Sequence, residues 1–194
     1  IQETAYGWNR YSGSACEQYL NSTADKDKWW VSRDGWDIAP DHLSSKPGFM
    51  SGLDASFIDI LSEIKIQTAV NTVQDKNDIG SDFETTFDKI FLASLEQEYI
   101  KPQLSGIEGS AWEYWKQRLG LNQPQEWYIN GINTRHIRYA LNGQASPQIV
   151  RLRSTYHNVA ANAWFILSSG AVSNGGSASD SYIRFCPACV IAGI

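Results

Sequence analysis

The chain has 194 residues, of which 42% are hydrophobic and 19% charged, and its formal net charge is -5. This length suits one domain with a substantial core, and the composition is that of a globular protein and not of a disordered one. The negative charge and the lack of a Lys/Arg-rich run argue against nucleic-acid binding, which needs a basic face. No apolar stretch approaches the roughly 18 residues of a membrane span. We therefore expect a single α+β domain over residues 1–194, without membrane insertion in this segment.

Helical signals come first along the chain. Ser14 and Glu17 have the spacing of a capping box, which predicts a short helix to about Leu20. Apolar residues recur at helical spacing between 53 and 64, behind the possible cap Asp54, and predict a second helix.

Two strand patterns and a third helix follow. Residues 64–70 alternate as a half-buried strand does, and residues 87–93 form another strand candidate, followed by a short helical turn from Ser94. Residues 112–119, closed by Gly120, predict a helix with its C-cap.

From residue 135 the pattern changes to strands and turns. Residues 149–153 alternate, and residues 164–172, with a turn at 168–170, predict a hairpin. We therefore expect the helices mostly in the N-terminal two-thirds and antiparallel strands and loops at the C-terminus.

The sequence offers little for catalysis. It contains no Gly-rich phosphate loop, nucleophile elbow or His-Glu-X-X-His motif, and no recognisable acid/base pair of carboxylates. Cys186 and Cys189 have the spacing of a redox or metal half-site, but they lie in an apolar run typical of a terminal strand, whereas a reactive pair needs a helix N-terminus. We expect buried structural thiols, no catalytic residue, no metal and no cofactor. A metal or redox site is the alternative.

The C-terminal region differs in composition from the rest. Residues 1–148 contain 8 Lys, 9 Glu, 11 Gln and 1 Met, whereas residues 149–194 contain none of these. Residues 155–183 are rich in Ser, Ala, Gly, Asn and Tyr, which resembles the chemistry of antibody binding loops. The alternative is an ordinary Gly/Ser-rich β-region that lacks long polar side chains by chance.

The genetic code offers an explanation for the missing residue types. If Asn codons ending in C or T are randomised at their first two positions, the products cannot include Lys, Glu, Gln, Met or Trp. Four of these five types are missing from residues 149–194, and the single Trp there is Trp164.

Five segments carry a resemblance to a known group of proteins. They are residues 6–21, 86–94, 151–154, 170–172 and 184–188. They resemble a bacterial and phage domain family of unassigned function, with its Trp-Leu-Arg-Ser, Gly-X-Val and Arg-Pro-Ala motifs, although Arg stands here in place of the motif Trp. Such domains look like variable proteins of diversity-generating retroelements, which use a C-type-lectin-like fold and diversify a C-terminal segment.

The resemblance implies a non-enzymatic display protein on a virion or cell surface, with a variable region over residues 149–194 that binds a protein or glycan. The C-type-lectin-like fold that the resemblance implies is also shared with formylglycine-generating enzymes, so an oxidase using Cys186 and Cys189 is the alternative. The expected scaffold residues are Arg153, Ala163, Trp164, Ile166, Gly170, Val172, Ala178, Arg184 and Pro187. The expected contact residues are Tyr156, His157, Asn158, Val159, Asn162, Phe165, Leu167, Ser173, Asn174, Ser177, Ser179, Asp180 and Tyr182.

Strand alternation places the contact residues on one exposed patch. Phe165 and Leu167 should share an outward face, with Trp164 and Ile166 facing inward. Tyr156, Phe165 and Tyr182 are the expected anchors, because aromatic side chains dominate interface energetics. The alternative is that Val159, Phe165 and Leu167 belong to the core.

Overall fold

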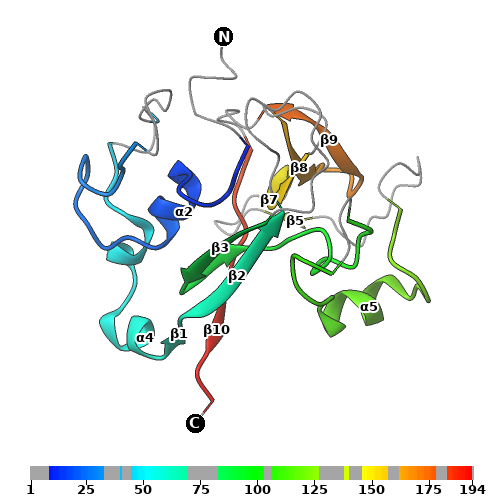
Figure 1. Cartoon of the computed structure of the whole chain (residues 1–194), viewed down its shortest axis with the longest axis horizontal. Helices are drawn as coiled ribbons and strands as arrows, with labels where there is room; N and C mark the ends of the chain where they lie inside the picture. Colours follow the sequence, from blue (N-terminus) through cyan, green and yellow to red (C-terminus); the bar gives the residue numbers. More distant parts are fainter. Residues whose placement is uncertain are drawn as a thin grey trace.

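A computed structural model of the chain describes residues 9–32, 40, 45–69, 83–102, 106–126, 138–139, 146–156, 162–177 and 183–193. These residues form a small mixed α/β domain with short helices and several antiparallel sheets (Figure 1). The helices of this part are α2 (Ala15–Leu20), the 3-10 helix η1 (Phe49–Gly52), α4 (Ala55–Asp59) and α5 (Glu113–Leu119).

The predicted start of α2 is confirmed, with Ser14 as the N-cap and Glu17 bonded to the residue before it. The Ser14 hydroxyl accepts a hydrogen bond from the Glu17 backbone N–H at 3.2 Å, and the Glu17 carboxylate accepts one from the Gly13 N–H at 3.2 Å. Two N–H groups without partners inside the helix are thereby satisfied, so this short helix begins where the sequence predicts.

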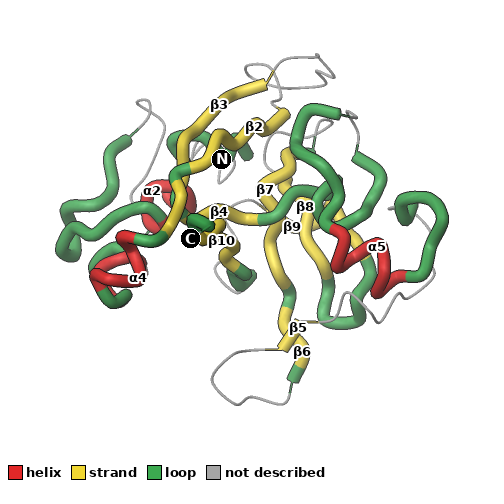
Figure 2. Tube along the Cα trace, turned by 90° about the horizontal axis from the view of Figure 1, so that it is seen from below, coloured by secondary structure: helices red, strands yellow, loops and turns green. Residues whose placement is uncertain are grey.

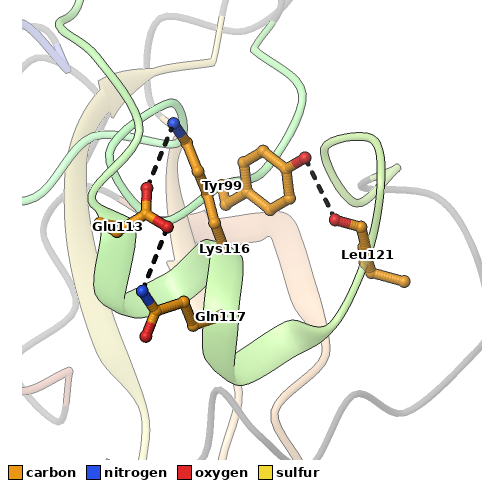
Figure 3. Close-up of polar contacts among 5 residues, drawn as sticks. All are labelled: Tyr99, Glu113, Lys116, Gln117 and Leu121. Carbon is orange, nitrogen blue, oxygen red and sulfur yellow. Dashed lines mark hydrogen bonds and ion pairs between the residues drawn. The ribbon is translucent and has the colours of Figure 1, made fainter.

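The C-cap of α5 is confirmed as well. Gly120 has a φ of 62°, a left-handed conformation that suits glycine, and its N–H donates to the Lys116 carbonyl at 3.2 Å. On the helix surface Glu113 binds Lys116 and Gln117, as Figure 3 shows, with N–O distances of 3.8 and 3.2 Å.

The second helix is shorter than predicted. Asp54 caps α4 through a 2.8 Å bond from the Ser56 N–H, but the helix ends at Asp59 instead of extending to residue 64. Leu61 pairs with Ile191 in a sheet, so a contact with a distant strand overrides the helical spacing of the local apolar residues.

The strands of the described residues form four sheets. The first has the order β1 (Leu61–Ser62), β10 (Pro187–Ile191), β4 (Ile90–Leu92). The two-stranded sheets are β2 (Ile64–Ala69) with β3 (Phe83–Asp88), and β5 (Arg138–Tyr139) with β6 (Pro147–Gln148). The last has the order β7 (Val150–Thr155), β8 (Asn162–Ile166), β9 (Val172–Ser177), and Figure 2 shows these three side by side. All ladders are antiparallel.

Most predicted strands are confirmed, with one division. The strand predicted over 64–70 is β2, and the one over 149–153 is β7. The candidate over 87–93 is split between β3 and β4, which are interrupted at Lys89. The helical turn from Ser94 is present, with the Glu98 N–H bonded to the Ser94 carbonyl at 3.1 Å.

The hairpin between β8 and β9 is also confirmed. The Leu167 N–H donates to the Ala171 carbonyl and the Gly170 N–H to the Leu167 carbonyl, each at 2.8 Å. Gly170 has a φ of 84°, which side chains disfavour, so glycine is required at this turn.

The expected separation between a helical N-terminal part and a stranded C-terminal part is not seen. Strands β1 to β4 lie between α4 and α5 in the chain, and the N-terminal two-thirds are built of strands and loops beside short helices. Figure 1 shows α2 and α4 at one end of the molecule and α5 at the other, with strands between them. Among the described residues, no helix has the length and apolar character needed to cross a membrane.

The buried apolar side chains form two clusters. One joins α2, η1, β1, β2 and β4, with Leu20 and Leu92 fully buried. The other joins β7 and β8 to the turn after β4, and its centre is Trp164, packed with Leu152 and Ile166. The second cluster includes residues of β7 and β8 and packs against Val172 of β9, so it supports strands that carry several of the expected contact residues.

Candidate functional site

The expected contact residues with described side chains lie on the β7–β8–β9 sheet and its connections. Tyr156 follows β7, Asn162 begins β8, and Leu167 follows β8. Ser173 and Asn174 belong to β9. All five are half-buried, so each side chain keeps part of its surface in solvent.

Phe165 corrects the expected alternation. Its side chain is only 5% exposed, and its neighbours Ala163, Trp164 and Ile166 are buried too. β8 is the central strand of its sheet and is covered on both faces, so successive residues cannot alternate between core and solvent. The prediction that Phe165 faces outward with Leu167 is therefore wrong. The continuous apolar run from 163 to 166 was the available signal for a strand buried on both faces.

The remaining expected contact residues are not placed. His157, Asn158, Val159, Ser179, Asp180 and Tyr182 lie outside the described residues, and so does the side chain of Ser177 at the end of β9. The single exposed patch therefore stays a prediction.

The scaffold prediction is confirmed at most described positions. Arg153, Ala163, Trp164, Ile166 and Gly170 are buried. Val172 and Pro187 are half-buried, and Ala178 lies outside the described residues.

Arg184 differs from the other scaffold residues. Its side chain is exposed, which corrects the expectation of a scaffold side chain there. Its backbone nevertheless connects to the sheet, because the Arg151 N–H donates to the Arg184 carbonyl at 3.0 Å and the Arg184 N–H donates to the Ile149 carbonyl at 2.9 Å.

A buried polar network connects β7 to the turn after β4. The Arg153 guanidinium, on a side chain 3% exposed, donates to the Leu92 carbonyl at 2.7 Å and to Gln97 Oε1 at 2.5 Å. It also donates to the Glu108 carbonyl. A charged hydrogen-bond fork with several acceptors fixes the strand to the turn after β4.

Glu108 completes this network. Its carboxylate, also 3% exposed, accepts from the Ala69 N–H at 3.1 Å and from the Ser154 hydroxyl. Burial raises the pKa of Glu108, and nearby Arg153 opposes that shift. The sequence motif indicated Arg153 and Ser154 but not Glu108 or Gln97, which come from loops without a distinctive pattern.

Glu17 and Asp88 form a carboxyl pair that the sequence did not indicate. Asp88 is 1% exposed and accepts from the Thr86 hydroxyl at 2.8 Å. Burial, followed by the charge of Asp88 and a hydrogen bond to it, raises the pKa of Glu17 to about 7. Burial likewise raises the pKa of Asp88. Because the pKa of Glu17 is raised to about 7, this buried carboxyl takes up a proton near neutral pH.

The groups around the pair are kept in their neutral forms. Burial raises the pKa of Cys16 to about 12, and that of Tyr11 well above its ordinary value. A thiol with such a pKa is not a thiolate at neutral pH and is a poor nucleophile.

Replacing Glu17 with Gln should remove a pH dependence of stability. The folded-state pKa of about 7 lies above the unfolded value of about 4.3, so the contribution of this group is fully present below that value and is lost as pH rises through 7. With a discount for partial exposure, we expect Glu17→Gln to raise the unfolding free energy at pH 8 by about 1–2 kcal/mol and to change it little at pH 4.

Urea denaturation at pH 4, 6 and 8 measures this effect. Glu113→Gln, an exposed carboxylate on α5, is the matched control and should leave the pH profile of the parent intact. A Glu17→Gln profile that parallels the parent at all three pH values would show that the pair does not hold the proton.

Cys186 and Cys189 lie at the terminal strand, as predicted, but their burial was predicted wrongly. Both are exposed, and both thiols are free. Cys189 belongs to β10, which runs extended from Pro187, and Cys186 directly precedes that strand, so the two Cα atoms are about 10 Å apart. A disulfide needs Cα atoms within about 7 Å, so these two thiols cannot bridge without disrupting the strand. The described residues contain no group of three or more His, Cys, Asp or Glu side chains that could hold a metal ion.

Together these features define a small mixed α/β domain in which a three-stranded antiparallel sheet rests on an apolar cluster and a buried polar network. A family model matches residues 1–193, and the chain belongs to that family, described as a domain of unknown function, DUF6273. No curated protein and no solved structure matches the chain.

Proposed function

We propose that this chain is a non-enzymatic ligand-binding protein with a C-type-lectin-like fold, displayed on a virion or cell surface. Its region 149–194 presents a diversified surface to a protein or glycan, as in variable proteins of diversity-generating retroelements. The observation that carries the proposal is the lack of Lys, Glu, Gln and Met in this region, against 29 such residues in 1–148.

The arrangement of β7, β8 and β9 supports the proposal. The side chains of Arg153, Trp164 and Ile166, on β7 and β8, are buried. Tyr156, which follows β7, and Asn174, on the edge strand β9, remain partly exposed. Binding residues are commonly placed this way, on connections held by a rigid scaffold, because their sequence can then change without unfolding the core.

Tyr156 is the best-supported contact residue. It follows β7 directly and its ring packs edge-to-face on Trp164, with 5.4 Å between the ring centroids. A half-buried tyrosine held by a core aromatic keeps few rotamers, so it loses little conformational entropy on binding a ligand.

The DNA around the gene tests the diversification directly. We expect a reverse-transcriptase gene nearby and a near-copy of the 3′ end of the coding sequence, differing from it mainly at codons for the contact residues. A locus without both elements contradicts the retroelement part of the proposal.

Binding is tested by display and selection. A library randomised at Tyr156, Asn162, Ser173 and Asn174 is selected against immobilised streptavidin as the probe protein. The matched control library is randomised at the exposed α5 residues Glu113, Tyr114, Gln117 and Arg118. We expect folded binders with micromolar or tighter Kd from the first library and none from the second, whereas equal yields would contradict a specialised surface.

The oxidase alternative is favoured by one observation, the exposure of both Cys186 and Cys189. The separation of about 10 Å between their Cα atoms argues against joint action on one substrate. Stoichiometric copper and an oxidase activity that is lost in Cys186→Ser would support this alternative over the binding proposal.

A further inference from the structure

We infer that Asn9 is a positioning residue for the proposed binding surface, because its side-chain amide joins the two ends of the connection between β7 and β8. Its Nδ2 donates to the Tyr156 carbonyl at 3.0 Å and to the Asn162 carbonyl. The Asn9 side chain is buried, with 2% exposed. This inference rests on the proposed function, since it assigns Asn9 to the support of that surface.

The two acceptors lie where the β7–β8 ladder ends. The last pair between β7 and β8 is Thr155 with Ala163, so Tyr156 and Asn162 lie outside this ladder, and Asn162 pairs on its other side with Ser177 of β9. Backbone carbonyls are strong acceptors, and one side-chain amide with two N–H groups serves both of them here.

The contact uses only backbone atoms of the two surface residues. Both bonds end on carbonyl oxygens, which every residue type has, so exchange of the Tyr156 or Asn162 side chain leaves them in place. By contrast, the bond from the Asn162 side chain to the Asn174 carbonyl, at 2.9 Å, is lost whenever Asn162 changes. Asn9 therefore provides support that does not depend on the sequence of the surface.

Asn9 is itself held by the scaffold and not by the surface. The next residue, Arg10, pairs with Glu84 of β3 at 3.1 Å, and Tyr11 is buried in the first apolar cluster. Farther along, the Asn21 side chain donates to the Ile90 carbonyl at 2.8 Å. The segment from 9 to 21 thus ties β7 and β8 to β3 and β4.

Backbone hydrogen exchange tests the positioning role without a ligand. We compare the parent with Asn9→Ala, which removes both donors, and with Asn9→Ser, which keeps one shorter donor. Asn21→Ala is the matched control, because it removes a side-chain amide that serves a different strand. We expect exchange of the amides of residues 155, 156, 162 and 163 to accelerate about tenfold in Asn9→Ala, less in Asn9→Ser, and not in Asn21→Ala. Unchanged exchange, or acceleration spread evenly over the chain, overturns the inference.

A second arm uses streptavidin-binding clones from the library described above. Three clones with different side chains at 156 and 162 receive Asn9→Ala, and the dissociation rate is measured. We expect it to rise by a similar factor of about five to ten in all three, because the lost support is the same backbone contact. Local exchange that rises with no change in dissociation rate overturns the positioning role. A library without binders contradicts the proposed function instead. The hydrogen-exchange experiment still tests whether Asn9 supports the ends of β7 and β8.

Discussion

Replacement of Arg153 with Met should lower the free energy of unfolding by about 3–5 kcal/mol, because it removes a buried charged group together with the hydrogen bonds that it donates. Two effects add in this variant. The carbonyls of Leu92 and Glu108 and the amide oxygen of Gln97 lose their donor. The buried Glu108 carboxylate also loses the nearby positive charge that opposes the rise in its pKa. Urea denaturation at pH 7 measures the loss.

Two further variants separate charge from geometry. Arg153→Lys keeps the charge but cannot reproduce a planar fork, so it should recover only part of the stability. Arg118→Met on exposed α5 is the control. Its free energy of unfolding should stay within about 1 kcal/mol of the parent value, even though the variant loses the contact of Arg118 with the Tyr114 ring. An Arg153→Met protein that unfolds at the urea concentration of the parent would show that the network contributes nothing to stability.

Replacement of Trp164 with Ala should also cost about 3–5 kcal/mol, because it empties a large volume inside a packed cluster. Trp164 is fully buried against Leu152 and Ile166, and the Tyr156 ring loses its edge-to-face partner. Thermal denaturation of the single variants measures the difference.

Ser173→Ala is the matched control on the neighbouring strand β9. Its side chain is half-buried and small, so its free energy of unfolding should remain within about 0.5 kcal/mol of the parent. If Trp164→Ala unfolds at the same temperature as the parent while Ser173→Ala is strongly destabilised, the assignment of core and surface in this sheet is wrong.

Local chemistry made several parts of the fold predictable. Ser14 and Glu17 define a helix start through hydrogen bonds four residues apart or less, and Gly120 and Gly170 satisfy conformations that other residues disfavour. The hairpin between β8 and β9 follows from the same kind of short-range requirement. Such features depend on neighbours in the chain, so the sequence alone predicts them.

The errors all come from contacts between distant segments. Leu61 fits the helical spacing but pairs with Ile191 instead, and Phe165 fits strand alternation but lies in a central strand covered on both faces. Cys186 and Cys189 lie in an apolar run, yet β10 leaves them exposed. In each case tertiary packing decides burial, and a short sequence window does not contain that information.

The candidate site divides in the same way. Arg153 and Trp164 could be assigned to the scaffold because a motif and a large aromatic side chain mark them. Glu108, Gln97 and Asn9 could not, because nothing near them in the sequence points to β7 or β8. The carboxyl pair of Glu17 and Asp88 is hidden for the same reason.

The position of β10 has a consequence for the order of folding. This strand lies between β1 and β4, so those two strands, which come much earlier in the chain, are hydrogen-bonded to β10 and not to each other. Closing such a long loop has an entropic cost before any contact forms, and folding slows as contacts become more distant in sequence. While the chain emerges from the ribosome, β1 and β4 therefore present unpaired backbone edges until residues 187–191 arrive. Open strand edges of this kind favour association with other chains, so the interval before β10 docks is when this protein is most exposed to misassembly.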